Sequence, residues 1–282
     1  MAVFLGSESG LSMQRLRGKS LERLSRDLYV PRGTERDLRV RTTGALLTLP
    51  DAVPCSLTSA LLQQLPVDDD GLIHLARART AARATRAGVK VHRMPVDADE
   101  QIDLDGLVVA DGPRTFVDLA AKLNLEQLVA VGDVVLRRFT REALTAAVVR
   151  RARRPGIVLA RQALPLLDPG SASPAETRAR LRLHAAGYTE LVHGVVIRDQ
   201  AGGWLAEPDL ADEVAKVAVQ HDGAVHFEGG LEQRRADLHR DELSRQHGWQ
   251  VVVSTAIDDR QPHLLLAKVA AAYERATRLR AS

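Results

Sequence analysis

One short segment, Asp168–Ser173, does most to constrain how this chain can fold. It reads Asp-Pro-Gly-Ser-Ala-Ser, so it is rich in turn-forming residues and lacks large apolar side chains. The 282-residue chain is also longer than most single hydrophobic cores. We therefore expect a domain boundary here, with one domain over 171–282 and two regions, 1–50 and 51–168, before it.

Composition excludes several classes of protein. Aromatic residues make up only 3% of the chain, so Leu, Val and Ala must build the cores. Because Cys55 is the single cysteine, no intramolecular disulfide and no cysteine-based zinc site is expected. No P-loop, GxGxxG, GxSxG or HExxH motif is present. The sequence has no apolar run long enough to span a bilayer, so we expect a cytoplasmic protein without a membrane partner.

The first 50 residues contain a candidate nucleic-acid-binding unit. Leucines spaced over 11–28, with Gly18 among them, predict two short helices and a turn, and Tyr29–Gly33 predicts a brief strand. This order suits a small winged-helix or helix-turn-helix unit, and it equally suits an ordinary helical packing unit. Both interpretations stay open.

Residues 35–168 have the pattern of mixed helices and strands. Helices are expected over 35–49 and 55–65, and a small sheet is expected from three short β-like runs. Helices then follow to the linker. The expected strands are 72–76, 89–94 and 107–110, and the later helices are 113–120, 125–138 and 140–152.

The C-terminal domain has the pattern of an α/β unit, in a chain that is α+β as a whole. Gly202 and Gly203 supply the positive φ that a hairpin turn needs between two apolar runs. Helices and strands alternate around this hairpin, so a sheet with a site at its strand ends is expected. The expected order is helix 174–186, strand 190–198, strand 204–210, strand 214–221, helix 231–247, strand 249–254 and helix 261–280.

Polar residues gather at the ends of the middle strands. Asp209 follows an apolar run, and Gln220 and Asp222 lie two apart on the next strand, so their side chains share one face. Gly223 allows a tight turn, after which His226 can return to the same edge as an acid or base. Hydrolysis of a phosphodiester needs this kind of set: oxygen ligands for Mg²⁺ or Mn²⁺ and a group that orients water.

Two further features have both a structural and a functional interpretation. Ser173-Pro174-Ala175-Glu176 is a capping box, so Glu176 either returns to the backbone of Ser173 or reaches the metal as a ligand. The charged helix 231–247 is either simply solvated or contacts DNA phosphates through its arginines. Those arginines are Arg234, Arg235 and Arg240.

The last 110 residues resemble the very-short-patch-repair (Vsr)-type endonuclease-like domain, a branch of the PD-(D/E)xK nuclease superfamily. The resemblance implies a restriction-endonuclease-like αβββαβ domain. It is carried by Ser173-Pro174-x-Glu176, Pro208-Asp209, Asp222-Gly223-x-x-His226, Asp237-x-x-Arg240 and Gly248-Trp249-x-Val251-Val252.

Residues 1–170 are similar to AbiEi-type antitoxins of type IV toxin–antitoxin systems, chiefly through the run Arg114–Ala120. In such antitoxins an N-terminal winged helix binds DNA, and a cognate toxin is the protein partner.

The nuclease resemblance implies that Asp209 and Glu176 bind the metal and that Asp222 and His226 complete the catalytic site. The family usually has Glu where this chain has Gln220, and an amide offers a metal oxygen without charge. Two functions therefore stay open: a Mg²⁺-dependent DNA endonuclease, weakened by Gln220, and a non-catalytic DNA-binding regulator built on a degenerate nuclease fold. The sequence fixes neither the DNA recognised nor the oligomeric state.

Overall fold

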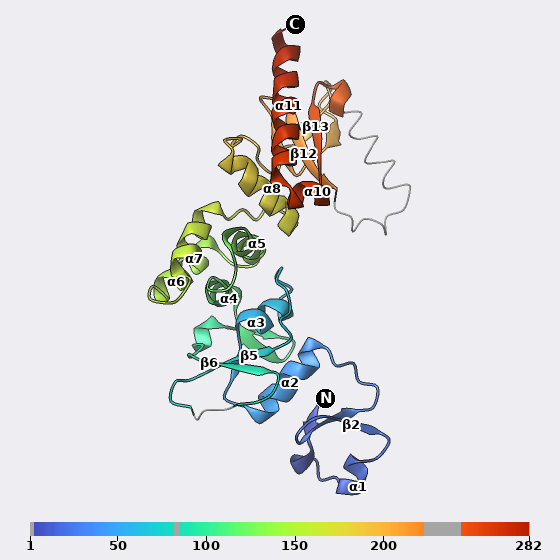
Figure 1. The fold of residues 1–282 in the computed structure, drawn as a ribbon, viewed down its shortest axis with the longest axis vertical. Helices are drawn as coiled ribbons and strands as arrows, with labels where there is room; N and C mark the ends of the chain where they lie inside the picture. The colour runs from blue at the N-terminus through green and yellow to red at the C-terminus, as the bar shows by residue number, and fades with distance from the viewer. Residues whose placement is uncertain (1–2, 82–84, 223–243, 282) are drawn as a thin grey trace. The chain divides into compact units, whose positions relative to one another are not determined.

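The computed structural model describes residues 3–81, 85–222 and 244–281, which form a mixed α+β protein (Figure 1). The chain divides into two compact units, Met1–Pro165 and Leu166–Ser282. The division falls just before the turn-rich segment Asp168–Ser173. Each unit has its own core, and each is described by itself.

The N-terminal unit begins with a three-stranded antiparallel sheet in the order β1-β3-β2. The second helix predicted within 11–28 is wrong, because Leu21–Ser25 forms strand β2. A two-residue turn joins β2 to β3, and Asp27 adopts a φ of 62° in it. Pairing with β3 and this turn override the leucine spacing. The elements are β1 (Phe4–Leu5), η1 (Gly6–Glu8), α1 (Met13–Leu16), β2 and β3 (Leu28–Pro31).

The middle of this unit confirms the predicted mixture of helices and strands. Strands β5 and β6 pair in parallel and β4 adds to β5, while β7 and β8 form a separate hairpin. Helix α2 starts where the Asp37 carboxylate accepts the Val40 N–H. The elements are α2 (Leu38–Thr48), β4 (Val53–Pro54), α3 (Ser56–Leu62), β5 (Ile73–Arg77), β6 (Val89–Arg93), η2 (Ala98–Glu100), β7 (Gln101–Leu104) and β8 (Leu107–Ala110).

Four helices complete the N-terminal unit, and the sequence predicted three of them. The fourth, α7, starts at Gly156, whose φ of 80° and close approach to the Ala120 backbone leave no room for a side chain. The helices are α4 (Gly112–Leu119), α5 (Leu125–Leu136), α6 (Arg141–Arg150) and α7 (Ile157–Ala163), followed by η3 (Leu164–Leu166).

The run Arg114–Ala120 has a structural role, because its polar side chains form buried hydrogen bonds. Arg114 is only 1% exposed, and its guanidinium donates to Asp118 at 3.0 Å, to Glu100 at 2.8 Å and to the Pro95 carbonyl at 3.0 Å. These bonds tie α4 to η2 and to the chain after β6. The buried hydroxyl of Thr115 lies beside Ser59 and the Ala110 carbonyl, which extends the polar core toward α3.

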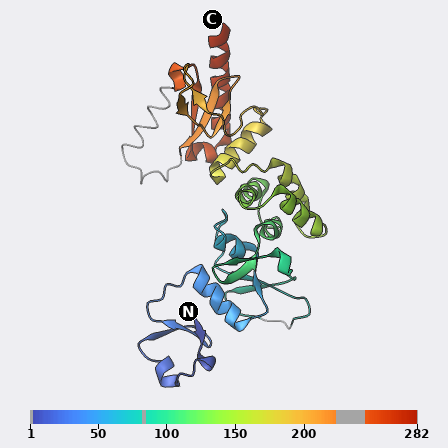
Figure 2. The same ribbon diagram turned by 180° about the vertical axis from the view of Figure 1, so that it is seen from behind.

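The C-terminal unit is built around a three-stranded sheet in the order β11-β12-β13. Strand β12 runs antiparallel to β11 and parallel to β13. Helices α8 and α11 pack on one face against Leu210, Val217 and Val219, and Figure 2 shows α11 behind the strands. The hairpin of β9 and β10 packs on the other face. The elements are α8 (Pro174–Ala185), β9 (Ile197–Arg198), β10 (Trp204–Ala206), β11 (Leu210–Asp212), β12 (Val217–Asp222), β13 (Gln250–Thr255), α10 (Ala256–Arg260) and α11 (Pro262–Ala281).

Two strand predictions need correction. In the predicted strand 190–198, only β9 and an isolated bridge between Val192 and Ala211 form. The predicted strand 204–210 is two strands in different sheets, β10 and β11. Pro208 lies between them, and it cannot donate a backbone hydrogen bond to a continuous ladder. Most of helix 231–247 lies outside the described residues.

Among the helices that the described residues form, not one combines the length and the apolar character that crossing a bilayer requires.

Replacing Arg114 tests the buried network. In Arg114→Lys, a single ammonium cannot reproduce the planar fork that reaches Asp118, Glu100 and Pro95 together. The free energy of unfolding of the N-terminal unit should fall by roughly 3–5 kcal/mol. Hydrogen exchange of the α4 amides in urea measures this loss. Arg161→Lys, at an exposed site on α7, is the matched control and should change it by less than about 0.5 kcal/mol. Equal small effects from both variants would contradict a structural role for Arg114.

Candidate functional site

The candidate site lies where the sheet of the C-terminal unit ends. Strands β12 and β13 run in parallel, so their carboxyl ends share one edge, with Asp222 opposite Thr255. Asp209 lies beside this part of β12, and Glu176 is in the first turn of α8. Strands β12 and β13, helix α8 and the residue before β11 thus contribute side chains near one edge.

Asp209 is the residue most firmly placed in the site. It directly precedes β11 instead of ending a strand, which corrects the sequence prediction. Its Oδ2 accepts the His221 backbone N–H at 2.6 Å, so the carboxylate satisfies a donor of β12 where β11 has not yet begun. This bond fixes the carboxylate beside the second half of β12.

The environment of Asp209 disfavours its charged form. Burial, helped to a smaller degree by the nearby Glu176 carboxylate, raises the pKa of Asp209 to about 6 against the lowering effect of the hydrogen bond from the His221 N–H. A carboxyl that is half-buried next to a second carboxylate is costly unless a cation joins them. This electrostatic arrangement is typical of a site for a divalent cation.

Glu176 lies in the first turn of α8, where its carboxylate accepts a backbone hydrogen bond. Its N–H donates to Ser173 Oγ at 3.2 Å, so Ser173 caps α8 as predicted. Its Oε2 accepts from the Ala172 N–H at 2.6 Å, one residue before the expected return to Ser173. The carboxylate is therefore held at the start of the helix, and its charge still acts on Asp209.

Gln220 and Asp222 project from the same face of β12, as their spacing predicts. Alternation puts them on the face of Ala218, which packs against the β9–β10 hairpin. The pairing of Leu210 with Val219, continued by one residue, sets Asp209 opposite Gln220. Gln220 is half-buried and Asp222 is exposed. The geometry thus associates Gln220 with Asp209 more closely than Asp222.

Sequence reasoning missed His193, which lies beside the site. Its Nε2 is 3.0 Å from Ser171 Oγ and 3.9 Å from the Asp168 carboxylate. Burial lowers the pKa of His193, while Asp168, a backbone hydrogen bond with Asp209 and the Glu176 charge partly oppose this effect. The sequence offered only a lone histidine in a predicted strand. It could not reveal the contacts of His193 with Ser171 and Asp209, because both residues are distant from it in the chain.

The donors of this edge fit a hard cation in part. Asp209, Glu176 and Gln220 offer carboxylate and amide oxygens, which Mg²⁺ and Mn²⁺ accept. Within residues 3–81, 85–222 and 244–281, no three His, Cys, Asp or Glu side chains gather as a metal cluster. Gln220 can add only a neutral amide oxygen to these two carboxylates. The predicted residues His226, Arg234, Arg235 and Arg240 lie outside the described residues.

The pKa of Asp209 generates a prediction about stability. The carboxyl holds its proton up to about pH 6 in the folded protein but only to about pH 4 when unfolded, so its charge destabilises the fold above about pH 6. This cost disappears as the pH falls through that interval. Asp209→Asn keeps an acceptor for His221, so in metal-free buffer it should raise the melting temperature at about pH 8 and give little gain at about pH 4.

Calorimetric scans of both proteins across this pH range measure the difference. Glu213→Asn is a suitable control, because Glu213 is an exposed carboxyl beyond the other end of β11. A gain that does not depend on pH, or a lower melting temperature for Asp209→Asn at about pH 8, would contradict the electrostatic assignment.

Comparisons with known proteins leave the function open. No family model matches the chain. It is 29% identical over 234 residues to two proteins from Mycobacterium tuberculosis, "Uncharacterized protein Rv2248" and "Uncharacterized protein MT2308", which covers 80% of this chain and 82% of each relative. The crystal structure of the RV2827C protein from the same species has a TM-score of 0.43 and 18% identity, over 64% of this chain and 75% of that one.

Proposed function

We propose that the C-terminal unit is a metal-dependent endonuclease domain that acts on DNA phosphodiester bonds. The observation that carries this proposal is the half-buried Asp209 carboxyl, held by the His221 N–H, whose pKa is raised to about 6 by burial and, to a smaller degree, by the nearby Glu176 carboxylate. Two carboxylates brought together in this way suit a shared divalent cation.

The order of elements supports a restriction-endonuclease-like domain. Helix α8 is followed by four strands, β9 to β12, and, after residues 223–243 outside the described part of the chain, by β13, α10 and α11. This order shares with the αβββαβ pattern of the resemblance its first helix, the strands that follow it and the later strand. Asp209 comes directly before β11, Gln220 lies on β12 and Glu176 is in the first turn of α8. The likeness to the Vsr-type family rests on these same residues.

Each residue has a defined task in this proposal. Asp209 and Glu176 would bind the cation through carboxylate oxygens, and Gln220 would add a neutral oxygen. The His221 N–H orients the Asp209 carboxylate before any ligand arrives. A bound Mg²⁺ or Mn²⁺ would supply positive charge to the phosphodiester oxygens. Asp222, exposed at the end of β12, and His226 would orient water.

A second function is favoured by one observation. Gln220 takes the place of an acid, and the described residues hold no cluster of three acidic, histidine or cysteine side chains. A site with two carboxylates binds a cation more weakly than one with three. The alternative is therefore a DNA-binding regulator of the antitoxin type, with a cognate toxin as partner and the nuclease-like domain kept as a scaffold.

Cleavage assays separate the two functions. Purified protein with Mg²⁺ or Mn²⁺ should nick or cut plasmid DNA, and Asp209→Asn should reduce the rate by at least about a hundredfold because the main metal ligand is lost. The control Glu213→Gln should cleave like the wild type.

Cleavage that persists in Asp209→Asn would show that the nuclease activity does not come from the site at Asp209. DNA binding without cleavage by the wild type would favour the regulator.

The proposal also predicts the effect of placing an acid at position 220. Gln220→Glu adds a charge next to the proposed cation, so the affinity for Mg²⁺ should rise about tenfold or more in calorimetric titrations. Gln200→Glu, in the exposed hairpin turn, adds the same charge elsewhere and should leave the affinity nearly unchanged. Equal affinities in all three proteins would exclude Gln220 from the metal site.

A further inference from the structure

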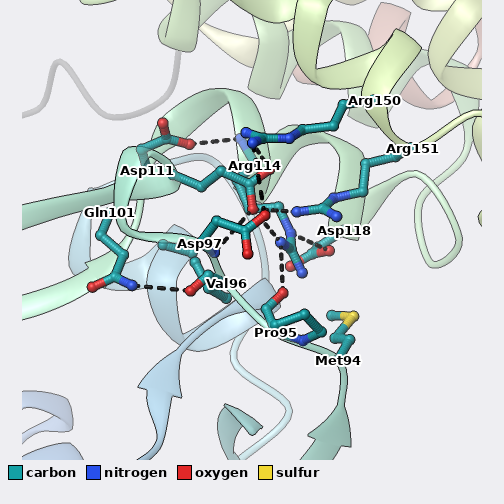
Figure 3. Close-up of polar contacts among 12 residues, drawn as sticks. Met94, Pro95, Val96, Asp97, Gln101, Asp111, Arg114, Asp118, Arg150 and Arg151 are labelled. Atoms are coloured by element: carbon teal, nitrogen blue, oxygen red, sulfur yellow. Dashed lines mark hydrogen bonds and ion pairs between the residues drawn. The ribbon is translucent and has the colours of Figure 1, made fainter. Parts of the chain in front are cut away.

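A hollow of about 360 Å³ in the N-terminal unit is lined mainly by arginines. It lies between the segment after β5, the chain that follows β6 and the end of α6. Figure 3 shows part of its wall, with Arg150 and Arg151 reaching into the network of ion pairs around Arg114. Its lining residues are Arg79, Met94, Pro95, Arg150, Arg151, Ala152, Arg153 and Arg154.

The acids next to the hollow pair with arginines, while one buried oxygen of Glu100 and one of Asp118 have no hydrogen-bond partner among the described residues. Glu100 receives Arg114 at 2.8 Å and also pairs with Arg151, while Asp118 receives Arg114 from the other side at 3.0 Å. Arg150 pairs with Asp99 at 2.9 Å. Within the described residues, these pairs leave the other arginines of the hollow without a carboxylate partner.

Three lining arginines carry the excess charge. In the described part of the chain, Arg79, Arg153 and Arg154 take part in no ion pair with an acid, and Arg79 and Arg153 are exposed. Burial lowers the pKa of Arg154, and the nearby Arg114, Arg151 and Arg79 lower it further against the single opposing charge of Asp118. Crowded cations of this kind are stabilised when an anion joins them.

Two buried guanidinium atoms of the same cluster lack an acceptor. Among the described residues, Arg151 Nε and Arg114 Nη2 are buried and have no hydrogen-bond partner. A buried donor without a partner costs free energy, so it marks a place where an outside acceptor would be stabilising. Arg151 also lines the hollow, so one of these donors belongs to a residue of its wall.

We propose that this hollow binds the phosphate groups of a nucleic-acid backbone. Guanidinium groups pair with phosphate oxygens in bidentate fashion, and several arginines along one open surface match a row of phosphates better than a single enclosed anion. The site lies in the other unit from Asp209. It therefore does not depend on the proposed nuclease activity, and either proposal can fail alone.

Fluorescence anisotropy with the full chain tests this site, with labelled duplex DNA and single-stranded RNA as probes in metal-free buffer. The double variant Arg79→Gln/Arg153→Gln should weaken binding of at least one probe by at least about tenfold. It should also reduce the slope of log K against log salt by roughly 1.5 to 2, as expected for two lost phosphate contacts. Both residues are exposed, so the melting temperature should stay close to that of the wild type.

Arg161→Gln removes an exposed arginine of α7 outside the hollow and should change the affinity by less than about threefold. Unchanged affinity and salt slope in the double variant would overturn the proposal. So would equal losses in the double variant and in Arg161→Gln, because binding would then follow total charge. Tight calorimetric binding of pyrophosphate with no binding of either nucleic acid would also overturn it, by identifying a small phosphate ester as the occupant.

Discussion

Strand β12 is the element on which the C-terminal unit depends. It pairs with β11 on one side and β13 on the other, and its Val217 and Val219 pack into the helical core. Its His221 N–H would be left beyond the end of β11, and the Asp209 carboxylate accepts it instead. One hydrogen bond thus completes the ladder and places the most important acid of the candidate site.

This placement costs stability when Asp209 is charged. Asp209 is half-buried near Glu176, so its ionised form is disfavoured until a cation neutralises both carboxylates. The arginine-lined hollow of the N-terminal unit carries a similar cost with the opposite charge. Its guanidinium groups outnumber the carboxylates that pair with them. In each unit a ligand of the complementary charge would relieve the crowding, and functional sites commonly carry such a cost.

The sequence predicted well where local signals decide the structure. Helix α8 begins at its Ser173 cap, and most helices and strands of the N-terminal unit match their predicted ranges because periodicity and turn residues are local. Strand β2 was missed because its pairing partner, rather than its leucines, determines it. The site needed long-range information: Pro208 sets Asp209 before β11, and the neighbours of His193 are distant in sequence.

The central claim is that Asp209 and Glu176, with the amide of Gln220, hold a divalent cation at the edge of the sheet. A crystal of the full chain soaked in Mn²⁺ tests it most directly through the anomalous scattering of the metal. The account predicts a peak within about 2.5 Å of carboxylate oxygens of both Asp209 and Glu176. An Mn²⁺-saturated crystal with no peak at this edge, or with a peak only elsewhere, would contradict it.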